Sequence, residues 1–229
     1  VGQDLFHAYL LAKQVLSKHP QITNLVLSVD YDMMGYTLNG TNQKYIDRQY
    51  FKYSDTMQDM SLSNKLMAKS NFFRCNRQIS WHKNDDKQKI RENTPNFVPI
   101  ESKPINDSVF CQKRAWEMTS IKFDSAMLDY NIHILQQFAE LCNQYQTQLI
   151  IIVPPKTTLF YYYANPYNTL LGKQALYKAI ASYSGIDLYD YYEQPWFNDS
   201  MFSDADHLNM DGVVCLSKII VSRENKKQQ

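Results

Sequence analysis

Short apolar runs alternate along the chain with longer stretches in which apolar side chains recur every three or four residues. The short runs cover residues 24–30, 148–153 and 186–188. Their length and their branched aliphatic content predict buried strands of a parallel sheet. The second run gives the clearest signal, because it is continuous and is followed by Pro154 and Pro155, which disfavour further strand pairing.

The longer stretches predict helices between and around these strands. Two of them follow residues that are well suited to cap a helix, Asp4 and Asp124. The four predicted helices cover residues 5–18, 128–145, 169–183 and 210–221, and a polar tail follows the last one. Strands that alternate with helices indicate an α/β fold with a parallel sheet. The carboxyl ends of such strands meet at one edge, where functional sites form in these folds.

Residues 31–122 show no clear period. The pattern favours helices at residues 45–53 and 62–73, and prolines at positions 95, 99 and 104 indicate irregular backbone. We interpret this region as an insertion over the sheet rather than as a separate domain, so that residues 1–229 form a single domain. A lid over a substrate cleft and a surface loop both fit the pattern.

Composition and charge exclude several function classes without selecting one. The chain has 229 residues and a formal net charge of +1, which gives no electrostatic basis for binding nucleic acid or an anionic membrane surface. No apolar run approaches the roughly 18 residues that a membrane-spanning helix needs. The 4 cysteines form no CxxC pair, so no zinc knuckle or redox motif is expected. The 17 tyrosines suit either a sugar-binding cleft or a half-buried core.

Residues 202–212 carry the candidate chemistry, between the third predicted strand and the last predicted helix. Asp204 precedes His207 by three residues, and on a tight turn its carboxylate can reach the imidazole Nδ1. Such a contact fixes the tautomer and stabilises the imidazolium that forms when the ring accepts a proton. Asp204 and His207 are therefore the candidate catalytic residues, and Asp206 is expected to be a solvated neighbour.

Two other interpretations of this stretch stay open. The turn can serve only to cap the next helix, for which Asn209 and Asp211 are suitable residues. It can also bind a metal ion through Asp204, Asp206 and His207, with Asp211 as a further ligand. The sequence shows no second histidine or carboxylate cluster that would complete a transition-metal site, so no metal is expected here.

The stretch resembles the last conserved block of the SGNH (GDSL-like) serine hydrolases, which reads Asp-x-x-His. It is most similar to the cell-envelope branch of that superfamily, whose members work beside membrane-bound O-acyltransferases in alginate acetylation or teichoic-acid D-alanylation. The matching residues are Asp204, His207, Leu208, Asn209 and Gly212. The predicted strands at residues 25–29 and 149–153, with two prolines after the second, also look like that branch.

The resemblance implies a three-layer, flavodoxin-like fold of the SGNH type and a serine esterase or O-acyltransferase that acts on acyl groups of a cell-surface polysaccharide. It assigns His207 as the general base and Asp204 as the residue that orients it, and it implies no cofactor. An acylated carbohydrate is the implied substrate, and a membrane-bound O-acyltransferase is a candidate partner. The resemblance also implies a periplasmic or other extracytoplasmic location, which the residues themselves do not determine.

The other blocks of the family match less well. No serine follows a strand as the nucleophile does, because Ser28 lies within the first predicted strand and Ser200 shares a loop with His207. Gly2, just before the first helix, resembles the glycine whose amide enters the oxyanion hole. The family's Gly-x-Asn block has no counterpart directly after residues 24–30.

We interpret these departures as an N-terminal truncation that leaves the nucleophilic serine upstream of Val1. The chain as given is then expected to be inactive by the covalent route. The alternative is a non-catalytic SGNH-like domain that binds polysaccharide or a membrane acyltransferase. With the upstream strands missing, residues 25–29 form an apolar sheet edge, which predicts either coverage by residues 31–122 or a homodimer.

Overall fold

The computed structural model describes residues 4–37, 62, 108–120 and 125–227 of the chain. Its helices and strands follow one another in the order expected of an α/β protein. The elements are α1 (Leu5–Lys18), β1 (Asn24–Ser28), the 3-10 helix η1 (Tyr31–Gly35), α5 (Ser108–Thr119), α6 (Ser125–Gln144), β2 (Gln148–Val153), α7 (Thr158–Tyr163), α8 (Pro166–Ile180), β3 (Ile186–Asp190), the 3-10 helix η3 (Asp199–Met201) and α9 (Met210–Lys227).

The three predicted strands form one parallel sheet in the order β1-β2-β3. The central strand β2 is the continuous apolar run, and its Ile150 pairs with Val26 of β1 and with Asp187 of β3. A parallel sheet with helices between its strands confirms the α/β class that the sequence predicts. All three strands end at the same edge of the sheet. The loops that follow them at this edge carry Asp30, Lys156 and Tyr191.

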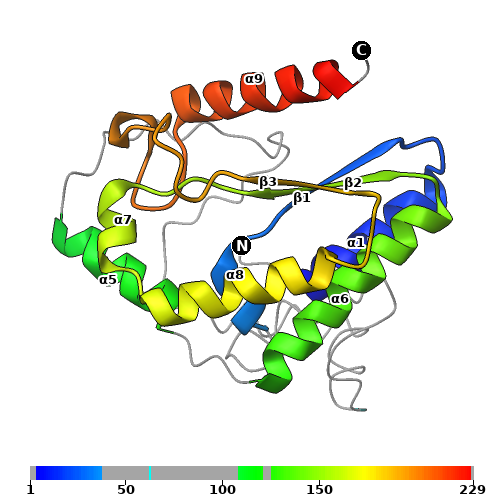
Figure 1. The fold of residues 1–229 in the computed structure, drawn as a ribbon, viewed down its shortest axis with the longest axis horizontal. Coiled ribbons are helices and arrows are strands. Elements are labelled where there is room, and N and C mark those ends of the chain that lie inside the picture. Colours follow the sequence, from blue (N-terminus) through cyan, green and yellow to red (C-terminus); the bar gives the residue numbers. More distant parts are fainter. Residues whose placement is uncertain (1–3, 38–61, 63–107, 121–124, 228–229) are drawn as a thin grey trace, which may run out of the picture.

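Helices cover both faces of this sheet, with α1, α6 and α8 on one side and α9 on the other (Figure 1). Successive side chains of a strand point to opposite faces, so β2 contributes to two separate cores. Leu149, Ile151 and Val153 join the larger core with the buried side chains of α1, α6 and α8. Ile150 and Ile152 join the smaller core, which α9 closes.

Strand β1 is an edge of the sheet that the described residues form. Val26 lies on the same face as its partner Ile150, yet 56 % of its surface is exposed. The described part of the chain therefore contains the apolar edge that the sequence predicts. The residues expected to cover it belong to 31–122, and most of these lie outside the described ranges.

Several element boundaries differ from the predicted ones for local reasons. Helix α8 begins at Pro166 rather than at residue 169, because the Asn165 side chain caps it and proline suits the first helical position. Helix α9 continues to Lys227 through the predicted polar tail. The short helices α5 and α7 were not predicted. The helices predicted at 45–53 and 62–73 lie outside the described residues, apart from Leu62, which is helical.

The loop after β1 is held close to α6 and α8. The Asn131 side chain of α6 is fully buried, and its Nδ2 donates to the carbonyl oxygens of Met33, Met34 and Tyr36 at 3.2, 2.9 and 3.0 Å. Gly172 of α8 lies so close that a Cβ atom there would be 2.1 Å from the Tyr31 carbonyl oxygen. Only glycine allows this approach, and the packing fixes the acidic residues that follow β1.

In the described part of the chain, no helix combines the length and the apolar character that crossing a membrane requires.

Candidate active site

The candidate residues lie on a closed turn between η3 and α9. An isolated antiparallel bridge joins Phe202 to Leu208, and the Ser203 amide donates to the His207 carbonyl oxygen at 2.8 Å. Asn209 then caps α9, because its Oδ1 accepts from the Gly212 amide at 3.1 Å. The capping role expected of Asn209 or Asp211 therefore falls to Asn209, and the turn has a defined shape before its side chains are considered.

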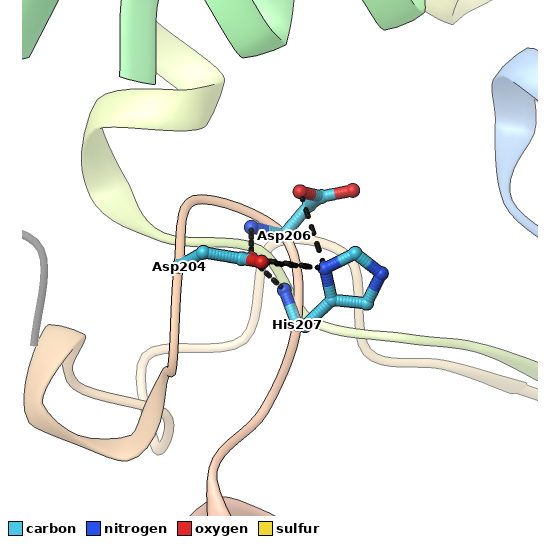
Figure 2. A group of neighbouring side chains, drawn as sticks. All are labelled: Asp204, Asp206 and His207. Atoms are coloured by element: carbon cyan, nitrogen blue, oxygen red, sulfur yellow. Dashed lines mark hydrogen bonds and ion pairs between the residues drawn. The ribbon is translucent and has the colours of Figure 1, made fainter. Parts of the chain in front are cut away.

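Asp204 and His207 are in direct contact on this turn, as their spacing predicts. The imidazole Nδ1 lies 2.8 Å from Asp204 Oδ2 and 3.0 Å from Oδ1 (Figure 2). Oδ1 also accepts from the backbone amides of Asp206 and His207 at 3.0 and 2.8 Å. Because an ionised carboxylate only accepts hydrogen bonds, Nδ1 carries the proton and Nε2 is free to act as a base.

The position of the ring suits proton transfer with a bound molecule. In Figure 2, Nε2 points away from both aspartates, and 60 % of the His207 side chain is exposed, against 30 % for Asp204. The turn follows β3 and lies beside the loop after β2, where Thr157 donates to the Ala205 carbonyl oxygen through its amide at 3.3 Å and through its hydroxyl at 2.9 Å. The pair therefore lies at the carboxyl edge of the sheet.

The charges of the two side chains support each other. Burial by itself raises the pKa of Asp204, but the hydrogen bonds from the His207 ring and from the backbone amides outweigh it and hold the pKa well below its usual range. The hydrogen bond to Asp204 raises the pKa of His207 above 6.5, and burial acts against it. The pair thus favours an imidazolium beside a carboxylate, the state that follows proton uptake at Nε2.

Asp206 is not the solvated neighbour that the sequence suggests. Only 4 % of its side chain is exposed, and it accepts two hydrogen bonds from the Arg114 guanidinium, both at 2.8 Å. Its Oδ1 lies 3.6 Å from the His207 Nδ1. The prediction was wrong because Arg114 comes from α5, 92 residues away, in a region whose pattern showed no period. Nothing local to Asp206 indicates such a partner.

A buried charged cluster lies behind the turn, and sequence reasoning missed it. Lys156 follows β2 and forms an ion pair with Asp30, which follows β1, at 2.8 Å. Burial disfavours the Lys156 charge, but Asp30, Asp206 and Asp32 outweigh it and raise the lysine pKa. Burial, followed by the charge of Asp30, raises the pKa of Asp32. Their position in the sequence could have indicated this cluster, because Asp30, Asp32 and Lys156 come shortly after predicted strands, at the edge where sites form in parallel sheets.

A small pocket lies against the same cluster. Its walls are Tyr31, Asp32, Thr119, Phe160, Thr169 and Tyr192. The rings of Tyr31 and Tyr192 are 4.8 Å apart between centroids, so part of the high tyrosine content is core packing at this edge. Thr119 and Thr169 contribute hydroxyl groups to the same lining. The pocket therefore combines aromatic walls with polar groups.

The metal-binding interpretation conflicts with contacts already made. Asp204, Asp206 and His207 offer ligand atoms within 4.8 Å of one another. However, Arg114 engages both oxygens of Asp206, and Asp204 is bonded to the ring and to two amides. To bind Asp206, a metal cation would have to displace the Arg114 guanidinium from at least one oxygen, and the two positive charges would then repel each other. The arrangement favours a hydrogen-bonded pair over a metal centre.

The other predicted positions are not brought to the His207 ring. Gly2 lies outside the described residues. Ser28 is an exposed residue of β1, and the Ser200 hydroxyl donates to the Asn198 side chain. In the described ranges, no serine hydroxyl is hydrogen-bonded to the ring, although Ser203 Oγ donates to the His207 carbonyl oxygen at 3.1 Å.

Comparison with known proteins gave no significant match to a family model, to a curated protein or to a solved structure.

Proposed function

We propose that this chain carries the general base of an SGNH-type serine esterase or O-acyltransferase with a flavodoxin-like, three-layer fold. The observation that carries the proposal is the Asp204–His207 pair at the carboxyl edge of a parallel sheet, with Nε2 directed to solvent. A histidine oriented in this way is suited to move a proton between a nucleophile and a leaving group.

The proposed reaction is a two-step acyl transfer. A serine upstream of Val1 attacks the acyl carbonyl carbon, and its proton passes to His207 Nε2. The ester C–O bond then breaks, and the leaving alkoxide takes that proton. Water or an acceptor hydroxyl next attacks the acyl-serine, again giving its proton to Nε2, which returns it to the departing serine oxygen. Asp204 stabilises the imidazolium, and the Gly2 amide is the proposed oxyanion donor.

The proposed substrate is an acylated cell-surface carbohydrate. The polysaccharide part of the proposal rests on the resemblance of residues 204–212 to the SGNH block, and the 17 tyrosines of the chain suit a sugar-binding cleft. An extracytoplasmic location and a membrane-bound O-acyltransferase partner belong to the same proposal. They rest on the Asp-x-x-His block and on the residues around it.

The test uses the natural protein with whatever sequence precedes Val1. We expect a fluorophosphonate probe to label one serine, and an activated aryl acetate to be hydrolysed with a burst of phenolate. Both should be lost in His207→Ala and retained in His133→Ala, an exposed histidine of α6. Hydrolysis that does not depend on His207 would reject the proposal. Labelling of a serine within residues 1–229 would reject the upstream position of the nucleophile but would still agree with esterase activity.

A second candidate is a non-catalytic SGNH-like domain that binds polysaccharide or a membrane acyltransferase. It is favoured by one observation: among the described residues, no serine hydroxyl contacts the His207 ring. This candidate predicts that the natural protein retains acetylated polysaccharide on a glycan array, that His207→Ala binds equally well, and that neither protein reacts with the fluorophosphonate.

A further inference from the structure

We propose that Arg114 and Asp206 are positioning residues for His207: the guanidinium holds and neutralises Asp206, so that Asp204 alone bonds to Nδ1. The catalytic meaning of this assignment rests on the proposed function, whereas its geometry and its test require no substrate. It gives α5, which belongs to the insertion predicted at residues 31–122, a direct role at the sheet edge.

The geometry separates two carboxylates that compete for one ring nitrogen. Asp204 Oδ2 lies 2.8 Å from Nδ1, a hydrogen-bond distance, whereas Asp206 Oδ1 lies 3.6 Å away, beyond one. The Asp206 oxygens instead face the Nε and Nη2 atoms of Arg114 at 2.8 Å each. This two-point contact fixes the plane of the carboxylate, which a single hydrogen bond does not do.

Without the guanidinium, Asp206 is a buried carboxylate that has lost both of its charge-assisted hydrogen bonds, and the charge of Lys156, which is paired with Asp30, acts on it only from a distance. Such a loss is costly, and the His207 Nδ1–H, 3.6 Å away, is a donor that can replace one of these bonds. The ring would then have two competing acceptors, and its orientation would no longer be unique. A general base needs one orientation of Nε2 toward its substrate, because small displacements reduce the rate strongly.

Charge balance leads to the same conclusion. With His207 protonated, Asp204, Asp206, Arg114 and His207 together carry no net charge. Arg114 lowers the pKa of His207, against the raising effect of Asp204 and Asp206. Lys156, Asp30 and Asp32 lie behind Asp206 and are unchanged in every variant considered below. Arg114 thus limits how far the two aspartates raise the pKa of His207. Without it, the ring would stay protonated near neutral pH and could not accept a proton from a nucleophile.

The anchoring of α5 makes this contact definite. Cys111 and Ala115, on either side of Arg114 along the helix, are buried in the larger core, so the helix cannot move freely. On its other side the turn is tied to the loop after β2 by the two hydrogen bonds from Thr157 to Ala205. The Asp206 side chain is therefore held between α5 and the loop after β2.

The test is an NMR titration of the His207 ring in the chain of residues 1–229. We expect Arg114→Gln to raise the His207 pKa, since it removes a cation and frees Asp206. We expect Asp206→Asn to lower it, since it removes an anion. If the pair only stabilised the turn, both variants would loosen it and move the pKa downward, toward 6.5. Shifts in opposite directions support the proposal, and shifts in the same direction overturn it.

Two further variants complete the design. Arg114→Lys keeps the charge and loses the two-point contact, so the His207 pKa should stay nearer the wild-type value than in Arg114→Gln. Lys113→Gln removes an exposed cation one residue away, which pairs with Glu117 at 3.8 Å, and should leave the titration unchanged. If Arg114→Gln does not give a dispersed amide spectrum, Arg114→Lys decides: a His207 pKa at or above the wild-type value supports the proposal, and a pKa lowered toward 6.5 overturns it. Opposite shifts together with no esterase activity in the natural protein would reject the proposed function but keep the positioning.

Discussion

The chain contains two Asp-x-x-His turns with nearly the same local geometry. At the start of α1, Asp4 Oδ1 accepts from the His7 amide at 3.0 Å and lies 2.5 Å from the ring Nδ1. Before α9, Asp204 Oδ1 accepts from the His207 amide at 2.8 Å, and Oδ2 lies 2.8 Å from Nδ1. In both turns, an aspartate three residues before a histidine satisfies an amide and the ring together.

The two turns differ in their surroundings. The side chains of Asp4 and His7 are both fully buried, and the His7 ring packs edge-on against Phe6 with 5.4 Å between centroids. The His207 ring is mostly exposed at the carboxyl edge of the sheet. The contact between aspartate and histidine is therefore a product of the turn and does not in itself indicate catalysis. Access of Nε2 to a ligand distinguishes the second turn, and the predictions below test that distinction.

The largest effect is expected from loss of the exposed ring. His207→Ala should lower kcat/KM of the natural protein for an activated ester by about 10³-fold or more, because it removes the general base. Its free energy of unfolding should change by less than about 0.5 kcal/mol, as is usual for exposed positions. Steady-state kinetics and urea unfolding of the same preparation check both parts. A large loss of stability with unchanged kinetics would reverse the roles of the two turns.

The buried ring should behave in the opposite way. His7→Ala should destabilise the chain by about 2–4 kcal/mol, since it leaves a cavity and a buried carboxylate that loses a close partner. The midpoint of urea unfolding measures this, with His133→Ala on the exposed face of α6 as the matched histidine control. Turnover by the remaining folded molecules should stay near the wild-type value. A His7→Ala protein as stable as the control would contradict the structural assignment.

The exposed turn depends on a close approach of its backbone to the start of α9. A Cβ atom at Gly212 would lie 2.3 Å from the Met201 carbonyl oxygen and 2.6 Å from Leu208 Cδ2. Gly212→Ala should therefore cost about 1–3 kcal/mol and displace His207, with a loss of activity out of proportion to the loss of stability. Gly185→Ala is the control, because a Cβ atom there would lie at an ordinary 3.7 Å from its nearest neighbour. Equal behaviour of the two variants would argue against a tightly packed turn.

The smallest effect concerns pH. The raised pKa of His207 adds stability that is fully present below about pH 6.5 and is lost as pH rises through the folded-state pKa. The lowered pKa of Asp204 adds stability that is present above about pH 4 and is lost as pH falls through the folded-state pKa. Asp204→Asn should remove this contribution, at most about 1 kcal/mol for so exposed a pair. It should also move the acidic limb of the rate profile to lower pH. Urea unfolding at pH 5.5 and 8.5 measures the first effect, and a limb that stays in place would contradict the Asp204 assignment.

The sequence alone determined the features that depend on neighbouring residues. The apolar run at residues 148–153 becomes the central strand with the predicted bounds, because a continuous branched aliphatic run between helices suits only a strand buried on both faces. The contact of Asp204 with His207 was predictable for the same reason, since both residues belong to one turn. The start of α8 was placed three residues late, although Asn165 and Pro166 carried the local signal for it.

The tertiary structure decided which of these local features face solvent and which charges meet. No pattern near Asp206 indicates that Arg114, 92 residues earlier, engages both of its oxygens. Similarly, nothing local to Asp4 and His7 separates them from the second Asp-x-x-His turn, yet packing buries the first pair completely and leaves the second open. Burial and long-range ion pairs depend on how distant elements pack, and packing is a property of the whole chain, whereas a turn or a strand is set by a few adjacent residues.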